Sequence, residues 1–509
     1  MTEKAKKYGA KQEESDTPRK VAFVYHGDKI VLPENMTLDE GRDALEAQIQ
    51  EESVTVTINE AIDAFPLDGA VALARVLQRR YGWTHLKPTP GFFGPRPPMM
   101  VGVEIGFGEH IQVPWGNMAV PKIEGTLTTS CNWIDGMPFF VLSGSVKRKS
   151  ERIVAAIAKE VREEVKKNSI YRRKAVKINF RDGDGNRKEF DFNLCPRFID
   201  MGTIGDTDPI FSKPIEDAVR INILNPIRFS SRCKAKGASL KKGIVLGGPF
   251  GTGKTLTAFQ VAKVCMENQW TFLYLEDVRD LDLAIGFAKL YGPCVLFAED
   301  VDRCATGPRT VEMDRLLNTM DGVESKGDLS LITVLTTNHL NSINPAFIRP
   351  GRIDAVINVT PPDEDACVRI IKKYVSEGGC DLNGTDAQLK EAIKPLLGAN
   401  AAFLRNAVEQ AKLSAIENME NDYSQVTISY KDIRIVAEGM VPHAKLINPE
   451  HGAKALLDLE SDNVEPMQMA MDIITQQFAE SIINMVADPK VLGKIVIKKM
   501  RRGMGPSMN

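Results

Sequence analysis

Long apolar runs, paired cysteines and a strong excess of charge are all missing from this 509-residue chain. No apolar run approaches the roughly 18 residues that a membrane-spanning helix requires, so we expect no transmembrane segment and no membrane partner. The 8 cysteines include no Cys-x-x-Cys pair, and the 6 histidines have no metal-ligand spacing. The formal net charge of −2 predicts no general attraction to nucleic acid. These absences exclude a disulfide scaffold, a zinc module and a strongly basic nucleic-acid binder.

The first 20 residues mix Lys and Glu without an apolar core or any periodicity. They predict a disordered tail and no secretory signal. Dispersed cysteines are typical of a reduced compartment, and we therefore expect a cytoplasmic location.

Residues 21–98 predict a small α+β domain that ends in a Pro-rich linker. A hairpin is expected over residues 21–32. Thr37, with Glu40 three residues later, predicts a capping box at the start of a helix. Prolines and glycines crowd residues 88–98, a pattern typical of a linker or an extended crossing.

Residues 99–205 predict a β-rich α+β domain. The stretch 99–145 is rich in Val, Ile, Phe, Gly and Thr, which favours short strands. Ser150 is expected to cap an amphipathic helix, and residues 174–180 and 187–194 are expected to pair as a hairpin. No motif in this part of the chain points to chemistry.

A Gly-rich turn at residues 248–255 is the strongest functional signal in the sequence. The pattern G-x-x-x-x-G-K-T is met by Gly248, Gly253, Lys254 and Thr255, between an apolar strand and a helix. Glycines let backbone N–H groups point at a triphosphate, and the helix adds its positive end. Lys254 is expected to reach the β- and γ-phosphates, and the Thr255 hydroxyl to bind Mg²⁺. The residues expected to bind the phosphates of ATP through this Walker A loop are Gly248, Pro249, Phe250, Gly251, Thr252, Gly253, Lys254, Thr255 and Leu256.

Two acids end an apolar strand at residues 295–300, which is a Walker B pattern. Buried parallel strands end at the edge of the sheet where ligands bind, and carboxylates there are costly unless they hold a cation or a water. One of Glu299 and Asp300 is expected to order Mg²⁺, and the other to polarise the attacking water. The alternative is a surface Glu-Asp pair without a role in chemistry.

Two further polar groups complete the candidate site. Asn338 ends a second apolar strand and could orient the attacking water, although a lone Asn is also a common turn former. Arg349 and Arg352 flank Pro-Gly, and a guanidinium fork suits the charge on a transferring phosphoryl group. We expect these arginines to act on the nucleotide of a neighbouring subunit, which requires head-to-tail contacts that close into a ring.

The fold class expected for the second half of the chain is α/β, with the parallel sheet of a P-loop NTPase. Strands are expected at 244–246, 271–276, 293–298 and 330–336, with helical patterns between them. The α/β domain is placed at residues 206–360 and a helical lid at 361–443. Residues 444–509 are expected to form a C-terminal helical extension that ends in a basic tail.

These motifs together resemble the AAA ATPase family over about residues 206–440. The P-loop, the acidic strand end, Thr336-Thr337-Asn338 and Arg349-Pro350-Gly351-Arg352 occur in the order of that family. The resemblance implies Mg-ATP hydrolysis in a homo-oligomeric ring, a hexamer or similar. It also implies that Asn338 is the first sensor and that Arg349 and Arg352 are trans-acting fingers.

One branch is more similar, the mitochondrial Rieske-protein translocase type, which also carries Glu-Asp where most relatives carry Asp-Glu. By position, Glu299 matches the metal-site acid and Asp300 the catalytic acid. The sequence lacks that branch's preceding membrane helix, the aromatic-Gly loop with which unfoldases grip peptides, and the His-Glu-x-x-His of fused metalloproteases. We therefore expect a chaperone-like ATPase that remodels or moves a protein cargo, whose identity the sequence does not give.

Two alternatives remain open at this point. A basic stripe on the helix at 150–168, flanked by further Lys and Arg, favours a nucleic-acid-associated ATPase. Acidic residues on the same helix favour a solvated face instead. The other alternative is a switch that assembles on ATP and turns over slowly, because Asp300 is one methylene shorter than the usual catalytic Glu.

Asp300→Asn tests the assignment of the catalytic acid. The amide cannot accept a proton from water, so we expect hydrolysis to be abolished while ATP binding survives. Phosphate release and ATP affinity are the two measurements. Persistent hydrolysis would show that another residue is the base.

Overall fold

The structure is a computed structural model, and it describes residues 24–26, 29–31, 36–82, 99–134, 136–181, 195–202, 208–305, 330–417 and 426–447, with a few single residues between these ranges. The predicted tail at 1–20 and the predicted extension beyond residue 447 lie outside the described residues, and so does nearly all of the linker at 88–98.

The first elements follow the sequence closely. β1 (Val24–His26) and β2 (Lys29–Val31) pair as an antiparallel hairpin. α1 (Leu38–Ser53) begins after Thr37, whose hydroxyl accepts from the Glu40 N–H while the Glu40 carboxylate accepts from the Thr37 N–H. The predicted capping box is therefore present.

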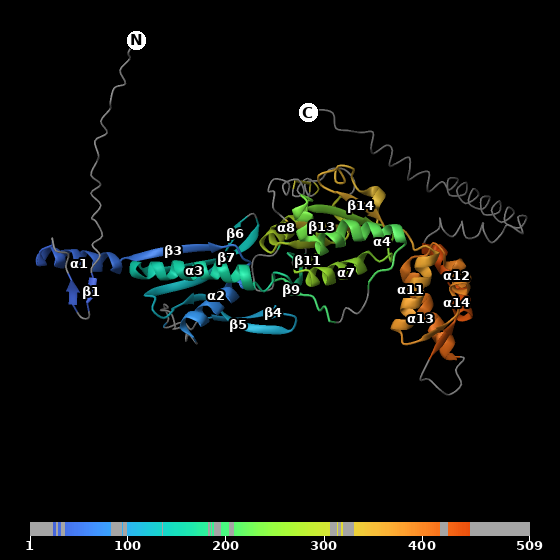
Figure 1. Cartoon of the computed structure of the whole chain (residues 1–509), viewed down its shortest axis with the longest axis horizontal. Helices are drawn as coiled ribbons and strands as arrows, with labels where there is room; N and C mark the ends of the chain where they lie inside the picture. The colour runs from blue at the N-terminus through green and yellow to red at the C-terminus, as the bar shows by residue number, and fades with distance from the viewer. Residues whose placement is uncertain are drawn as a thin grey trace, which may run out of the picture.

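A five-stranded antiparallel sheet forms the N-terminal unit, with strand order β3-β7-β6-β5-β4. Two helices, α2 and α3, pack together against it (Figure 1). The elements of this unit are β3 (Thr55–Ile62), α2 (Pro66–Tyr81), β4 (Met99–Gly106), β5 (Glu109–Met118), β6 (Gly125–Ile134), β7 (Met137–Lys147) and α3 (Arg148–Asn168). Because β3 pairs with β7, the domain boundary that the sequence placed at residue 98 runs through a single sheet.

The amphipathic helix α3 is present, but Ser150 is not its cap. The helix begins at Arg148, and its N-cap is Lys147, without a side-chain capping bond. Ser150 is buried, and its hydroxyl oxygen accepts a hydrogen bond from the Glu124 N–H at 3.1 Å. Ser150 therefore joins α3 to the loop before β6 instead of starting the helix.

The second sheet has seven strands in the order β14-β10-β13-β12-β11-β8-β9, and all neighbours are parallel except β8 and β9. Its strands are β8 (Ala175–Ile178), β9 (Arg197–Phe198), β10 (Lys242–Gly247), β11 (Thr271–Leu275), β12 (Cys294–Ala298), β13 (Leu331–Thr337) and β14 (Ala355–Asn358). The predicted α/β class with a parallel sheet is confirmed. The boundary placed at residue 205 does not separate two folds, because β8 and β9 extend this sheet.

Helices cover both faces of the seven-stranded sheet (Figure 1). One face packs on α7 (Lys254–Glu267) and on α4 (Lys213–Val219), the π-helix η1 (Arg220–Leu224) and α5 (Asn225–Arg228). The other face packs on α8 (Leu281–Leu290) and shares one core with the N-terminal unit. The shorter elements are α6 (Ser230–Ala235), η2 (Val278–Asp280), α9 (Asp302–Ala305) and η3 (Leu340–Ser342).

The helical lid follows the sheet and has its own core. It contains α11 (Glu364–Glu377), α12 (Asp386–Ile393), η4 (Lys394–Leu396), α13 (Ala401–Glu417) and α14 (Tyr430–Ile447). The helices α11, α12 and α13 lie within the helical lid predicted at residues 361–443. The sequence did not predict the short parallel pair β15 (Asp381–Asn383) and β16 (Thr427–Ser429).

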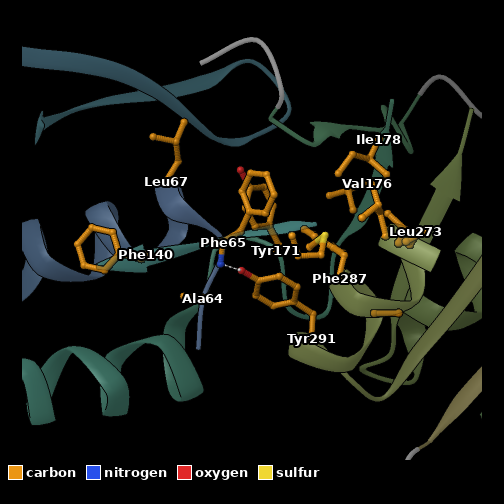
Figure 2. Close-up of a cluster of buried hydrophobic side chains, with 14 of the residues drawn as sticks. Ala64, Phe65, Leu67, Phe140, Tyr171, Val176, Ile178, Leu273, Phe287 and Tyr291 are labelled. Carbon is orange, nitrogen blue, oxygen red and sulfur yellow. Dashed lines mark hydrogen bonds between the residues drawn. The ribbon is translucent and has the colours of Figure 1, made fainter. Parts of the chain in front are cut away.

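Aromatic side chains join the N-terminal unit to the second sheet (Figure 2). Phe65 at the start of α2 lies edge-on to Tyr171 and Phe287, and Tyr171 lies edge-on to Tyr291. The buried Tyr291 hydroxyl accepts a hydrogen bond from the Phe65 N–H at 2.8 Å (Figure 2). A backbone amide of one unit thus donates to a side chain of the other.

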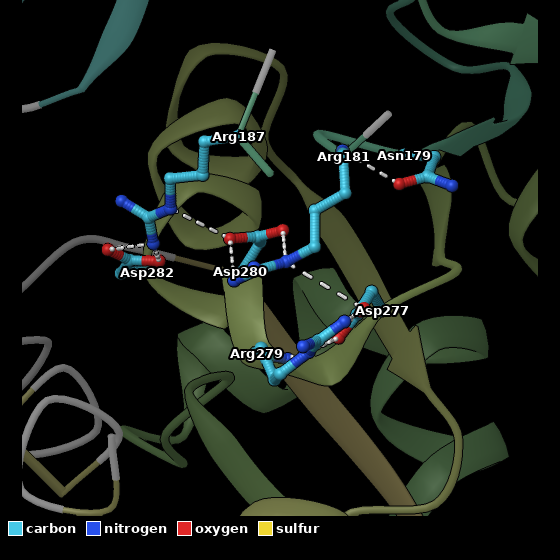
Figure 3. A network of polar contacts seen from close by, with 7 residues as sticks. All are labelled: Asn179, Arg181, Arg187, Asp277, Arg279, Asp280 and Asp282. Carbon is cyan, nitrogen blue, oxygen red and sulfur yellow. Dashed lines mark hydrogen bonds and ion pairs between the residues drawn. The ribbon is translucent and has the colours of Figure 1, made fainter. Parts of the chain in front are cut away.

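An ionic network links two segments that follow strands of the seven-stranded sheet (Figure 3). Asp280, whose side chain is fully buried, pairs with Arg181 at 2.8 Å and Arg187 at 2.9 Å. Arg187 also pairs with Asp282 at 3.0 Å. Both arginines lie in the segment after β8, and Asp280 lies in the segment after β11. The chain between β11 and α8 is therefore held in place by the segment that follows β8.

Tyr291→Phe tests the junction. The change leaves the buried Phe65 N–H without its acceptor, which costs about 1–3 kcal/mol. We expect the midpoint of unfolding, monitored by fluorescence, to move to a lower urea concentration. Tyr430→Phe in the partly exposed lid surface is the control and should leave the midpoint unchanged. Equal effects of the two substitutions would contradict a specific role for the Tyr291 hydroxyl.

Candidate functional site

The Gly-rich turn runs from the carboxyl end of β10 to the start of α7. Gly248 has φ +152°, and a Cβ on it would lie 2.2 Å from the Val359 oxygen. Gly253, the N-cap residue of α7, has φ +99° in the left-handed region. Only glycine takes both backbone shapes without strain. The turn therefore presents the free N–H groups of a 14-residue helix at the edge of the sheet.

Lys254 lies folded over this turn. Its Nζ donates to the Gly248 and Pro249 carbonyl oxygens, each at 2.7 Å. Burial lowers the pKa of Lys254, while the nearby carboxylates of Asp300 and Glu299 oppose that shift. The ammonium group is therefore held where a phosphate could take over both of its hydrogen bonds.

Glu299 lies directly after β12 and faces the start of α7. Its Oε1 accepts from the Thr255 hydroxyl at 2.6 Å, and its Oε2 accepts from the Tyr274 hydroxyl at 2.8 Å. Burial and the Glu299 carboxylate raise the pKa of Tyr274, so its hydroxyl keeps the proton that it donates. Thr255 and Glu299 offer oxygen atoms only, which is the donor set that Mg²⁺ prefers. These residues therefore fit the predicted ion.

Asp300 is held on both carboxylate oxygens. Asn338 Nδ2 donates to Oδ1 at 3.1 Å, and Arg303 pairs with Oδ2 at 2.7 Å. The Asp300 backbone has φ +55°, a left-handed conformation that is uncommon for residues other than glycine. Strained backbone of this kind gathers at functional sites. Asn338 therefore lies beside the predicted catalytic acid, and Arg303 was not foreseen from the sequence.

A cavity of about 320 Å³ opens over these groups. This volume lies at the lower end of the range for small-molecule sites. It is lined from the sheet by the turn, Glu299, Asp300, Thr336 and Asn338, and from the lid by Tyr374, Ala401, Ala402 and Arg405. The cavity therefore lies between the sheet and the lid.

The lid reaches the turn through backbone and amide contacts. Asn400 Nδ2 donates to the Phe250 oxygen at 2.8 Å, and the Ala402 N–H donates to the Gly251 oxygen at 3.2 Å. Within the lid, the Arg405 guanidinium lies over the Tyr374 ring at 5.6 Å. The start of α13 and the residues just before it therefore lie beside the turn.

Not every residue of the predicted phosphate loop lines the cavity. Phe250, Gly251, Gly253, Lys254, Thr255 and Leu256 do. The Gly248 and Pro249 oxygens hold Lys254, and the Thr252 hydroxyl donates to the Pro249 oxygen at 2.9 Å. Gly248, Pro249 and Thr252 therefore stabilise the loop through hydrogen bonds inside it.

Arg349 and Arg352 do not line this cavity. The Arg349 side chain is exposed and has no hydrogen-bond or ion-pair partner among the described residues. Arg352 donates to the Ala346 oxygen at 2.5 Å and lines a second cavity of about 170 Å³. Lys242 and Gly243, at the start of β10, line the same cavity. The length of β10, roughly 15 Å, thus separates Arg352 from the turn of its own chain.

Arg162 of the basic stripe on α3 is paired within the protein, and so are several of the cations that flank the stripe. Arg162 pairs with Glu60, Arg148 with Glu51 and Lys149 with Glu124. Arg172 donates to two backbone oxygens of the α8 region. The side chains of Arg152, Lys159 and Lys166, the rest of the stripe, are exposed and have no ion-pair partner among the described residues, so pairing affects the flanks of the stripe more than the stripe itself.

Comparison with known proteins identifies the domain. Residues 244–361 match the family described as "ATPase family associated with various cellular activities (AAA)". The chain contains an AAA ATPase domain. The match covers the P-loop, both acids, Asn338 and both arginines.

Similar proteins extend this result. The AAA region is 31% identical over 225 residues to the proteasome-activating nucleotidase of Methanococcus maripaludis, covering 40% of this chain and 52% of that protein. It is 28% identical over 237 residues to the ATP-dependent zinc metalloprotease FtsH 4 of Synechocystis, covering 42% and 37%. The match to FtsH of Helicobacter pylori strain J99 is 29% over 252 residues, covering 45% and 39%. The chain thus spans about half the length of the nucleotidase and less of the proteases.

In the part of the chain that the structure describes, no helix combines the length and the apolar character needed to cross a bilayer.

Four residues of the AAA site were missed in the sequence. Tyr274 and Arg303 contact the two acids, and Tyr374 and Arg405 line the cavity from the lid. Arg303 could have been found, because it lies three residues after Asp300. Tyr274 and the two lid residues carry no local signal, since only the register of the strands and the docking of the lid bring them to the site.

Arg303→Gln tests whether the ion pair restrains Asp300. The Arg303 side chain is 72% exposed, so the pair is worth at most about 1 kcal/mol. Removing it frees one carboxylate oxygen, and we expect basal ATP hydrolysis to rise up to about fivefold. Arg303→Lys keeps the charge and is the control. A fall in turnover would show instead that Arg303 assists the reaction.

Proposed function

We propose that this protein is an Mg-ATP-hydrolysing, oligomeric AAA ATPase that remodels or moves a protein cargo. One observation carries the oligomeric part: the cavity collects the P-loop, both acids and Asn338, whereas Arg349 and Arg352 lie outside it. A guanidinium group stabilises charge on a transferring phosphoryl group. In this proposal, a neighbouring subunit supplies it, and the subunits close into a ring such as a hexamer.

The proposed chemistry assigns one task to each residue. The turn and Lys254 bind the β- and γ-phosphates. Thr255 and Glu299 hold Mg²⁺, which when bound offsets charge on the phosphate oxygens. Asp300 accepts a proton from the attacking water, and Asn338 orients that carboxylate. The four lid residues that line the cavity keep bulk water away from the nucleotide.

The action on protein cargo rests on the named relatives. By name, one activates a proteasome and the others are ATP-dependent proteases. The sequence of this chain has no His-Glu-x-x-His, so we propose remodelling or movement of cargo and not cleavage. Within the family, the Glu299-Asp300 order supports the Rieske-translocase type as the nearest branch. The five-stranded N-terminal unit is the proposed site of cargo recognition.

The mode of action follows from the segment after β11. In this proposal, the cargo is not gripped there, because Asp280 and Asp282 tie that segment to Arg181 and Arg187 (Figure 3). The N-terminal unit and the seven-stranded sheet share one core. Motion of whole subunits within the ring would then move the N-terminal unit and its cargo together.

Slow turnover is a second candidate feature of the same function. Both oxygens of Asp300 have partners, so fewer of its acceptor positions are left for a proton from water. This favours a slow, assembly-dependent ATPase. A nucleic-acid-associated role has less support, because acidic residues share α3 with its basic stripe.

Mixing two inactive variants tests the trans-acting arginines. Arg349→Ala or Arg352→Ala is expected to lower turnover by about 1,000-fold or more without weakening nucleotide binding in the same subunit. Asp300→Asn inactivates the other half of each site. When either arginine variant is mixed equally with Asp300→Asn, random assembly should restore about a quarter of the wild-type rate.

The control is each variant mixed with itself, which should stay inactive. Co-purification of an untagged variant with an affinity-tagged one, in a slowly hydrolysed ATP analogue, shows that the mixed subunits co-assemble. If co-assembled mixtures stay inactive, the arginines do not act across the interface, and the proposal of a shared site fails.

A further inference from the structure

Tyr274 lies on the face of the sheet that α7 covers. It is the fourth residue of β11 and pairs in register with Phe297 of β12. The two rings stack, with centroids 6.2 Å apart and planes 9° apart. Phe297 is fully buried, so it gives the Tyr274 ring a fixed surface to lie on. The phenol is therefore held along the sheet, with its hydroxyl toward the edge where β12 ends.

Glu299 stands two residues after Phe297 and projects to the same face. The Tyr274 hydroxyl meets its Oε2 at 2.8 Å, while the Thr255 hydroxyl meets its Oε1 at 2.6 Å. An ionised carboxylate has about four acceptor positions, so two remain after both contacts. The carboxylate is thus fixed at both oxygens and can still accept hydrogen bonds from other groups.

A fixed carboxylate matters because this acid is Glu. Glu has one more rotatable bond than the Asp that most AAA relatives carry at this position. An unrestrained Glu would spread its oxygens over a larger volume, and fewer of its conformers would suit a hydrated cation. Tyr274 has a rigid ring and a single donor, and that donor lies where the longer side chain of Glu299 places its carboxylate.

We propose that Tyr274 is a positioning residue for the magnesium site, and that its hydroxyl holds the Glu299 carboxylate in the orientation that binds hydrated Mg²⁺. The inference rests on the proposed function, because it assumes that nucleotide binds with Mg²⁺. Groups that orient metal-binding side chains typically change metal affinity by 10- to 100-fold when removed. Tyr274 does not touch the nucleotide cavity, so its effect acts through Glu299.

The experiment measures binding of a fluorescent ADP analogue to the full chain, first in EDTA and then across a Mg²⁺ titration. Tyr274→Phe removes only the hydroxyl. We expect a rise of about 10-fold in the Mg²⁺ concentration that gives half of the maximal change in nucleotide binding. Metal-free nucleotide binding is expected to stay at the wild-type value. Tyr430→Phe, in the lid surface, is the matched control and should change neither value.

A second background makes the test specific. Glu299→Asp withdraws the carboxylate by one methylene, so the Tyr274 hydroxyl loses its partner. In that background, Tyr274→Phe should change the Mg²⁺ requirement less than twofold. An equal change in both backgrounds would overturn the proposal, because the hydroxyl would then act without Glu299.

Two other results would also overturn it. One is a Mg²⁺ requirement within twofold of wild type in Tyr274→Phe. The other is loss of metal-free nucleotide binding in that variant, since the hydroxyl would then support the fold of the site as a whole. Failure of the wild-type protein to bind nucleotide in EDTA or Mg²⁺ would instead contradict the proposed function itself.

Discussion

The parallel pairing of β13 between β10 and β12 is the constraint on which the site depends. Gly247 pairs in register with Thr337, and Ala298 pairs with Leu335. The turn, the two acids and Asn338 therefore leave the sheet at one edge, although more than 80 residues of sequence lie between the first and the last. All three strands are buried on both faces, so a slip of one residue would exchange two packed sets of side chains. The strand register that packs the core therefore also brings the site residues together.

The inverted order of the acids is accommodated by two local features. Glu299 is long enough to meet Thr255 and Tyr274 at once. Asp300 takes a left-handed backbone conformation, and its N–H donates to the Thr336 hydroxyl at 3.3 Å. This turn directs the shorter carboxylate toward Asn338. Each acid is therefore oriented by neighbours on a different strand, and the two carboxylates have separate sets of partners.

The N-terminal unit and the AAA sheet are packed as one body, whereas the lid meets them through fewer, more polar contacts. Phe65, Tyr171, Phe287 and Tyr291 close a shared core, and β8 continues the sheet on β11. The lid is tied mainly by Asn400 to the turn and by Arg369 to Glu216 and the Phe211 oxygen. Hydrogen bonds near solvent are more easily exchanged than a buried aromatic core. A nucleotide bound between sheet and lid is thus placed to change the position of the lid first.

The sequence by itself determined the P-loop, the acidic strand end, the capped first helix and the parallel class of the sheet. Each of these features depends on residues that are close in the sequence, because glycine placement, capping spacing and strand periodicity are local properties. Tertiary structure alone decided that β3 belongs with β4 to β7, that β8 joins the AAA sheet, and that Ser150 is buried inside α3 instead of capping it. It also decided that Tyr274 and Arg405 reach the site while Arg352 lies at the other end of β10. These outcomes depend on which strands become neighbours and in what register, and that choice is made by the packing of residues far apart in sequence.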